Sequence, residues 1–250
     1  MNPLTRLRVK VFADGADRAG MLEMYRNPLI KGFTTNPTLM RKAGVTDYEA
    51  FARQIAADIP DRHLSFEVFS DEFDEMEEQA RRIASWGENV YVKIPITNTR
   101  GESSVPVVGD LARAGVRLNV TAVFTLRQVS EVCHAIGGRA PAVVSVFAGR
   151  IADAGVDPAP VMTAARELVS MYSDIELLWA SPREVCNVFQ ADAAGCHIIT
   201  VANDLLKKLD SVGKDLSQFS LETVRMFRTD ALKAGFTLGD QRRDPQRKAA

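Results

Sequence analysis

Lys93 stands out chemically in this chain of 250 residues, because it interrupts the apolar run NVYVKIPI at 89–96. Side chains of a strand alternate between two faces, so Lys93 would share one face with Tyr91 while the aliphatic residues occupy the other. Burial among apolar neighbours disfavours the charged form of a lysine, and a neutral amine is a nucleophile. Such an amine can attack a ketone carbonyl to give an imine, which serves as an electron sink for cleavage of a carbon–carbon bond.

Polar side chains in other apolar runs are predicted to lie on the same face of their strands as Lys93, which is the face toward the interior. An isolated charge in a protein interior is costly, and buried Lys or Glu is rare without partners. Taken singly, each could be a core polar group with satisfied hydrogen bonds, but seven groups in phase favour a site. Besides Lys93, the predicted members are Asp14, Asn36, Glu67, Asn119, Thr121 and Ser145. Glu67 or Asp14, directly or through a water, could carry the protons that imine chemistry requires.

The elements that must position these groups are short β-branched runs separated by helical patterns. In the segment 71–86, for example, acids open the first turn and Arg81 and Arg82 lie near the end, as the helix dipole prefers. Parallel neighbours need crossover connections, and eight such units close naturally into a barrel. The predicted strands are 8–14, 32–37, 63–69, 89–96, 117–124, 142–148, 175–181 and 197–202.

We therefore predict an α/β fold, a TIM (β/α)8 barrel in a single domain, with a doubly wound open sheet as the structural alternative. The barrel is expected to occupy residues 1–236. The remaining residues, 237–250, read as a polar C-terminal tail.

Composition narrows the classes of partner and compartment. The chain is 46% hydrophobic and 25% charged with a formal net charge of -1, so we expect small-molecule partners, no nucleic acid and no membrane. Cys133, Cys186 and Cys196 are an odd number without CxxC spacing, and we expect reduced, buried thiols rather than disulfides or a zinc site. The three histidines are scattered, so no metal is expected. Without a signal-peptide pattern or a long apolar run, the expected location is cytoplasmic.

Seven motifs lie in order along the predicted strands. They are VFADGAD around Asp14, TTNP at 34–37, SFEV at 65–68, VKIPIT at 92–97, NVTAVF at 119–124, SVFAGRI at 145–151 and ASPR at 180–183. In this combination the chain resembles the transaldolase family of class I, Schiff-base aldolases, which have a barrel fold. Its length places it near the compact branch that includes fructose 6-phosphate aldolase. The resemblance spans roughly residues 8–235.

The resemblance implies roles at the matching positions. Lys93 looks like the Schiff-base lysine, and Glu67, Asp14 and Thr121 would hold a catalytic water and pass protons. The residues implied in substrate binding are Asn36, Asn119 and Ser145 for a dihydroxyacetone unit, Arg150, Ser181 and Arg183 for a sugar phosphate, and Phe147 as an aromatic wall. Arg150 and Arg183 could instead be surface salt-bridge partners, and Phe147 could be core. No cofactor is implied.

Three functions remain open from the sequence. The first is a transaldolase that moves a dihydroxyacetone unit from fructose 6-phosphate or sedoheptulose 7-phosphate to an aldose phosphate, as in the pentose phosphate pathway. The second is a fructose 6-phosphate aldolase that releases free dihydroxyacetone; Glu67 favours the first, because that position looks like glutamine in those aldolases. The third is a non-catalytic sugar-phosphate-binding barrel. We also expect a homo-oligomer. Trp179 has the strand parity of Ser181 and is bulkier than the residue expected there in compact members, so the sequence leaves the pocket size and the choice of acceptor open.

Overall fold

The computed structural model describes residues 3–238. The chain divides into two compact units, one of residues Leu4–Asp210 and one whose described parts are Pro3 and residues 211–238. The second unit contains the helix α11 (Leu216–Lys233). Most of the predicted polar tail, from residue 239 onward, lies outside the described residues, so the predicted division at 236 stays a prediction.

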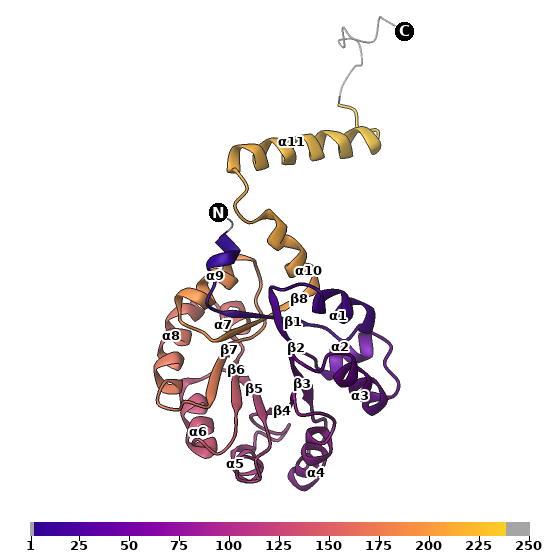
Figure 1. The fold of residues 1–250 in the computed structure, drawn as a ribbon. Coiled ribbons are helices and arrows are strands. Elements are labelled where there is room, and N and C mark those ends of the chain that lie inside the picture. Colours follow the sequence, from indigo (N-terminus) through magenta and orange to yellow (C-terminus); the bar gives the residue numbers. More distant parts are fainter. Residues whose placement is uncertain (1–2, 239–250) are drawn as a thin grey trace, which may run out of the picture. The chain divides into compact units, whose positions relative to one another are not determined.

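The larger unit is a closed parallel barrel in which β1 pairs with β8, so the predicted TIM barrel is confirmed (Figure 1). The parallel ladder runs through consecutive strands without a break, which excludes the open sheet. The strands are β1 (Lys10–Asp14), β2 (Ile30–Thr34), β3 (His63–Glu67), β4 (Val90–Pro95), β5 (Leu118–Val123), β6 (Ala142–Val146), β7 (Ile175–Trp179) and β8 (Ile198–Ala202).

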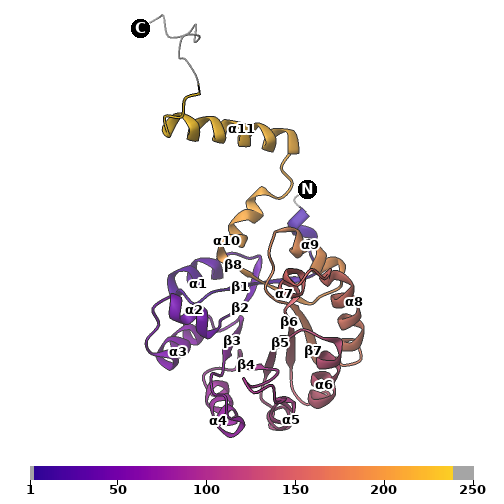
Figure 2. The ribbon, with the colours of Figure 1, turned by 180° about the vertical axis from the view of Figure 1, so that it is seen from behind.

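Helices surround the strands, as the views from the front and from behind both show (Figures 1 and 2). The helices of this unit are α1 (Arg18–Tyr25), α2 (Pro37–Lys42), α3 (Tyr48–Asp58), α4 (Phe73–Ala84), α5 (Val105–Arg113), α6 (Leu126–Ile136), α7 (Ala148–Asp153), α8 (Pro158–Val169), α9 (Cys186–Ala193) and α10 (Asn203–Leu206). Short 3-10 helices cover Pro3–Arg6 and Lys207–Ser211. The helix expected within 71–86 is α4, with Arg81 and Arg82 in its last turn.

Local sequence explains where strands give way to helices. β2 ends at Thr34, and Asn36 caps α2 by accepting a hydrogen bond from the Leu39 amide, with Pro37 at the first helical position. The Asn36 side chain therefore stands at the carboxyl end of a barrel strand, where the active sites of such barrels are built.

The strand alternation sorts side chains as expected. Val90, Val92 and Ile94 of β4 are buried, and the same strand carries Tyr91 and Lys93 on its other face. An apolar cluster of Phe12, Val143, Leu178, Ala180 and Ile198 packs together, with Tyr91 and Phe147 against it. Interior side chains of alternate strands fill such barrels in layers, so this cluster supports the polar groups above it.

The prediction of buried cysteines holds for two of the three. Cys133 and Cys196 are buried as predicted, but Cys186 is exposed, because it opens α9 on the outside of the barrel.

Among the described residues, no helix is both long and apolar enough to cross a membrane.

Candidate active site

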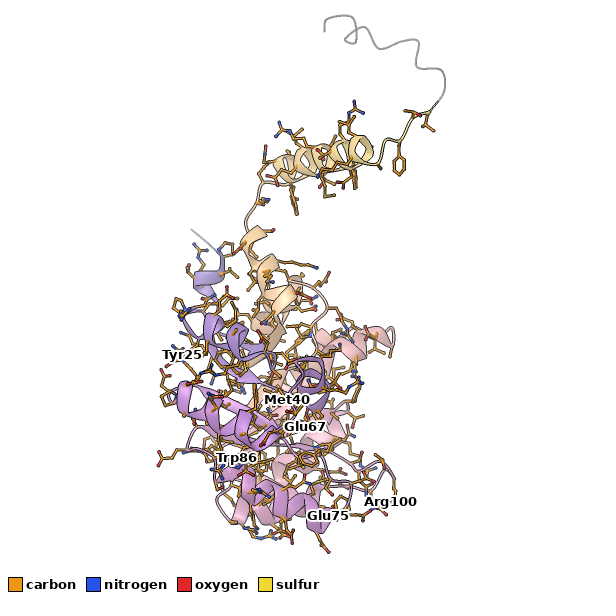
Figure 3. The ribbon with its side chains drawn as sticks, turned by 90° about the vertical axis from the view of Figure 1, so that its right-hand side faces the viewer. Tyr25, Met40, Glu67, Glu75, Trp86 and Arg100 are labelled. Atoms are coloured by element: carbon orange, nitrogen blue, oxygen red, sulfur yellow. The ribbon has the colours of Figure 1, made fainter. Side chains whose placement is uncertain are left out.

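Lys93 and Glu67 are partners in the register between β4 and β3, which brings their side chains together inside the barrel. The Lys93 Nζ lies 3.0 Å from Glu67 Oε2 and donates a hydrogen bond of 3.1 Å to the carbonyl of Thr35. Lys93 is only 8% exposed. In the view of Figure 3, Glu67 falls near the middle of the barrel unit, whereas Glu75 and Arg100 fall near its edge. The amine thus has a carboxylate within direct proton-transfer distance.

Asp14 ends β1 on the same cavity. Its carboxylate accepts a hydrogen bond of 2.7 Å from the Thr34 hydroxyl, which in turn lies 2.5 Å from the hydroxyl of Thr200. Since the proton of Thr34 goes to Asp14, Thr200 must donate to Thr34. Burial raises the pKa of Asp14, and the nearby Lys93 charge and the Thr34 hydrogen bond oppose that rise only partly. The Asp14 carboxyl therefore gains and loses its proton at a pH closer to neutral than an ordinary aspartate does, which suits a proton carrier.

A chain of buried hydrogen bonds crosses the interior beneath the cavity. The Ser145 hydroxyl donates to Asn119 Oδ1 at 2.6 Å, and Asn119 Nδ2 donates to the Ser65 oxygen at 2.9 Å. Ser65 Oγ lies 2.7 Å from Nε2 of His63, which stacks on Tyr91 with ring centroids 3.7 Å apart. Burial lowers the pKa of His63 to about 3, so the ring is neutral and Nε2 can accept the Ser65 proton. All hydrogen bonds of this chain then donate toward His63. Because the Ser145 hydroxyl uses its proton for Asn119, it offers lone pairs to the cavity.

The cavity above these groups has a volume of about 130 Å³. Eight of the eleven predicted site residues line it: Asp14, Asn36, Lys93, Thr121, Ser145, Phe147, Arg150 and Ser181. Two others touch this group, because Glu67 contacts Lys93 and Asn119 contacts Ser145. Thr121 Oγ1 is buried without a hydrogen-bond partner among the described residues. A buried hydroxyl of this kind can hold a water or a substrate oxygen.

The residues predicted to bind phosphate divide into two groups. Arg150 is exposed at the cavity rim, and its guanidinium lies 5.3 Å from the ring centre of Phe147. Arg183 does not line the cavity; its guanidinium is held by both carboxylate oxygens of Asp153. Arg183 is therefore in the salt bridge that the sequence left open as its alternative role.

Close backbone packing sets the position of Ser181 and the start of α7. The Gly149 amide donates to the carbonyl of Ala180 at 3.2 Å, and a Cβ on Gly149 would lie 1.5 Å from the Ser181 carbonyl oxygen. Ser181 has φ of 60°, in the left-handed region that L-residues rarely adopt. Such backbone conformations cluster at functional sites, where surrounding structure maintains them.

The expectation that Trp179 shares a face with Ser181 is wrong. Ala180 and Ser181 both line the cavity, whereas Trp179 is fully buried and does not. Simple alternation fails here because β7 ends at Trp179 and the left-handed Ser181 redirects the chain. Thr200 also lines the cavity and was not predicted. It is a polar residue in the apolar run HIITVA, two positions after the interior residue Ile198, and this spacing could have revealed it.

No group of His, Cys, Asp and Glu residues within 3–238 has an arrangement that could hold a metal ion. The groups present are an amine, carboxyls, hydroxyls, amides and a guanidinium. Together they can form a covalent adduct with a carbonyl compound, move protons and bind an anionic group.

Known proteins provide an independent comparison. The model of the family described as transaldolase/fructose-6-phosphate aldolase matches residues 11–238. A "probable transaldolase" of Dehalococcoides mccartyi is 34% identical over 205 residues, which cover 80% of this chain and 90% of the relative. A protein of the same description from Streptococcus pyogenes serotype M5 is 34% identical over 202 residues, with the same coverage. A crystal structure of a candidate lyase/mutase from Burkholderia cenocepacia J2315 has a TM-score of 0.56 at 15% identity, covering 97% of this chain and 90% of its own, which speaks to the fold alone.

Proposed function

Because the chain belongs to the transaldolase/fructose-6-phosphate aldolase family and is thus an aldolase-type enzyme, we propose that it is a transaldolase using Lys93 as the Schiff-base lysine. It would transfer a dihydroxyacetone unit from a ketose phosphate, fructose 6-phosphate or sedoheptulose 7-phosphate, to an aldose phosphate. One observation carries the proposal: the buried Lys93 amine lies 3.0 Å from the Glu67 carboxylate beside a polar-lined cavity.

The proposed first step is attack of the Lys93 amine on the ketone carbon. Glu67 accepts a proton from Lys93 so that the lone pair is available, and the resulting carbinolamine loses water to give the imine. Removal of a proton from the substrate hydroxyl on the β carbon then breaks the bond between the α and β carbons, with the electrons drawn into the imine. An aldose leaves, and the three-carbon unit stays on Lys93 until it adds to the acceptor aldehyde.

Asp14 and Thr121 are the proposed handlers of protons and water in these steps. The raised pKa of Asp14 suits a group that accepts the hydroxyl proton and later returns it. The unpartnered hydroxyl of Thr121 would position the water that leaves and re-enters.

The substrate is proposed to lie with its three-carbon unit against Asn36, Asn119 and Ser145. Ser145 commits its proton to Asn119 and so can accept a hydrogen bond from a substrate hydroxyl. The phosphate would meet Arg150 and Ser181 at the rim. Arg183 could join them only by exchanging Asp153 for the phosphate.

Borohydride trapping tests the Schiff base. Incubation with fructose 6-phosphate and borohydride should add the mass of a reduced sugar adduct to the peptide containing Lys93. The variant Lys93→Met should give no adduct, whereas Lys31→Met, which changes an exposed lysine, should react as the wild type does. An adduct on another lysine would remove Lys93 from this role, and the absence of any adduct in the wild type would favour the non-catalytic barrel.

The alternative activity, aldol cleavage with release of free dihydroxyacetone, is distinguished by its need for an acceptor. A transaldolase turns over fructose 6-phosphate only when an aldose phosphate is present. Release of dihydroxyacetone at the same rate without acceptor would establish the aldolase instead. Assays with several phosphorylated aldehydes would then identify the natural acceptor.

The expected homo-oligomer and cytoplasmic location stay predictions. The helix α11 supports the first, since it carries Leu216, Phe219, Val224 and Phe227, which a single helix cannot bury by itself. Light scattering of the purified chain would measure its oligomeric state.

A further inference from the structure

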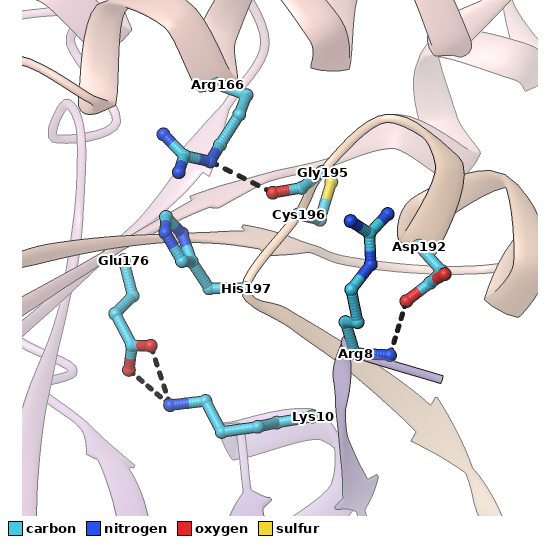
Figure 4. Close-up of a pocket in the computed structure, with 8 residues that line it drawn as sticks. All are labelled: Arg8, Lys10, Arg166, Glu176, Asp192, Gly195, Cys196 and His197. Atoms are coloured by element: carbon cyan, nitrogen blue, oxygen red, sulfur yellow. Dashed lines mark hydrogen bonds and ion pairs between the residues drawn. The ribbon is translucent and has the colours of Figure 1, made fainter. Parts of the chain in front are cut away.

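A second cavity of about 350 Å³ opens among residues at the amino ends of the barrel strands (Figure 4). Lys10 opens β1, Glu176 is the second residue of β7, and His197 directly precedes β8. Asp14, which lines the candidate active site, is at the other end of β1. Four residues of strand span about 13 Å, so the two cavities are separate.

The two carboxylates that line this second cavity are already engaged. Both oxygens of Glu176 lie 2.6 Å from the Lys10 amine. Asp192 Oδ1 accepts hydrogen bonds from the backbone amides of Arg8 at 2.7 Å and Val9 at 2.9 Å. The side chain of Asp192 thus holds the main chain at the entry to β1.

The guanidinium groups of two arginines line the same cavity. Arg166 uses its Nε to donate to the carbonyl of Gly195 at 3.0 Å, and its two terminal nitrogens have no hydrogen-bond or ion-pair partner in the described chain. The Arg8 guanidinium likewise has none among residues 3–238, since only its backbone amide meets Asp192. The cavity thus contains three cationic side chains and two carboxylates, and the donors left without a partner belong to the guanidinium groups of Arg8 and Arg166.

His197 adds a neutral donor. Its Nδ1 accepts a hydrogen bond of 2.8 Å from the Leu177 amide, which fixes the ring proton on Nε2. Burial, with the nearby charges of Arg166 and Lys10, lowers the pKa of His197 against the opposing effect of Glu176. The ring is therefore neutral at physiological pH, with one N–H available in the cavity.

We propose that this cavity is a second binding site for a phosphate group, inorganic phosphate or a small phosphate monoester, held by Arg8, Arg166 and His197. A guanidinium fork matches the oxygens of phosphate, and its charge-assisted hydrogen bonds are stronger than neutral ones. The cavity volume leaves room for the organic part of a monoester beside the phosphate. Because it lies at the opposite end of the strands from Lys93, the site would act on the enzyme from a distance or store the ligand, and would not take part in the reaction.

Calorimetric titration with inorganic phosphate at constant ionic strength tests this site. The titration uses the variant Arg150→Gln, so that the phosphate ligand proposed for the active site is absent. In that background, Arg8→Gln should raise the dissociation constant of phosphate about tenfold or more, the loss expected for one charge-assisted contact. Arg8→Gln keeps the backbone bond to Asp192, so the fold should persist.

Arg41→Gln is the matched control, because it removes an exposed arginine of α2 that lines neither cavity. It should leave the dissociation constant unchanged. Arg166→Lys, which keeps the charge but loses the fork, should weaken binding independently. Equal binding in all these variants, or no saturable binding in the Arg150→Gln background, would overturn the proposal. Arg8→Gln in the otherwise unchanged enzyme should trap sugar at Lys93 normally, so a failed trap and a failed second site are separate results.

Discussion

At the scale of single residues, the proposed chemistry depends on the ion pair between Lys93 and Glu67. The strand pattern predicts a buried amine with Glu67 as a candidate proton carrier, and in the structure the Glu67 carboxylate lies 3.0 Å from that amine. A buried charge loses much of its hydration, so its partner matters more than at the surface. Glu67 thus balances the buried charge of Lys93 and can accept its proton.

Replacing Glu67 by Ala should slow turnover by on the order of 10²-fold or more, the typical contribution of a general acid–base group. Imine trapping at Lys93 should remain possible, because the amine itself is intact. Steady-state kinetics and borohydride trapping on the same preparation measure the two effects. Unchanged turnover would exclude Glu67 from proton transfer.

Asp14 should stabilise the fold less when ionised than when protonated. Its pKa is raised in the native state by burial, so its contribution is favourable below the ordinary pKa of an aspartate, about 3.9, and is lost as pH rises through the raised value. Asp14→Asn should therefore unfold at a higher temperature than the wild type at neutral pH, with a difference that shrinks toward acid. Turnover should fall. A variant less stable at neutral pH would contradict the assigned cause of the shift.

At the scale of elements, the chain from His63 to Ser145 links β3, β5 and β6 through side chains. Replacing His63 by Leu would leave the buried Ser65 hydroxyl without an acceptor, at a cost of about 1–3 kcal/mol. The Michaelis constant should rise, because the hydrogen bonds of Asn119 and Ser145 would no longer have a fixed donor and acceptor order. His63→Gln, which offers an acceptor oxygen, should recover part of both effects.

The pH dependence of stability tests whether the His63 ring is buried in its neutral form, which acceptance of the Ser65 proton requires. Its pKa is lowered to about 3, so its contribution to stability is present above about 6.5 and is lost as pH falls toward 3. The difference in unfolding free energy between wild type and His63→Leu should shrink between pH 7 and pH 4. A difference independent of pH would contradict the burial of a neutral ring, whereas recovery by His63→Gln tests the acceptor role.

A second feature at this scale is the close packing of α7 against the residues that follow β7. In Gly149→Ala the new methyl would overlap the Ser181 carbonyl, so the backbone must shift, at about 1–3 kcal/mol, and turnover should fall with the displaced rim. Gly109→Ala in α5 is the control, because its Cβ would lie 3.6 Å from the nearest atom. That change should stabilise the helix by roughly 0.5–1 kcal/mol. Similar melting temperatures for the two variants would argue against the close packing at Gly149.

At the scale of the whole molecule, the closed barrel protects two of the three thiols. Burial raises the pKa of Cys133 to about 11 and of Cys196 to about 12, while Cys186 is exposed. Since the thiolate is the reactive form, an aromatic disulfide reagent should titrate one thiol in the native chain and three after denaturation. Cys186→Ser should leave no fast-reacting thiol. Rapid reaction of all three in the native state would contradict the barrel packing.

The sequence by itself determined the barrel and the content of its interior. Alternation with a period of two is a local property, so the order of residues alone assigns Lys93, Glu67 and Asn119 to one face. Parallel strands whose like ends lie together then bring these residues side by side, with Lys93 at the cavity and Glu67 and Asn119 next to residues that line it. The register between neighbouring strands confirms this arrangement, since Lys93 pairs with Glu67 on one side and with Asn119 on the other.

Only the tertiary structure decided the contacts made where strands end or between distant segments. Trp179 and Ser181 have the same parity, yet the left-handed Ser181 breaks the alternation and sends them to different sides. The pairing of Arg183 with Asp153 and the direction of protons toward His63 depend on side chains from different elements. The cavity between Arg8 and Arg166 joins residues more than 150 positions apart. No local pattern encodes such pairings, because they depend on how the closed ring of strands brings loops and helices together.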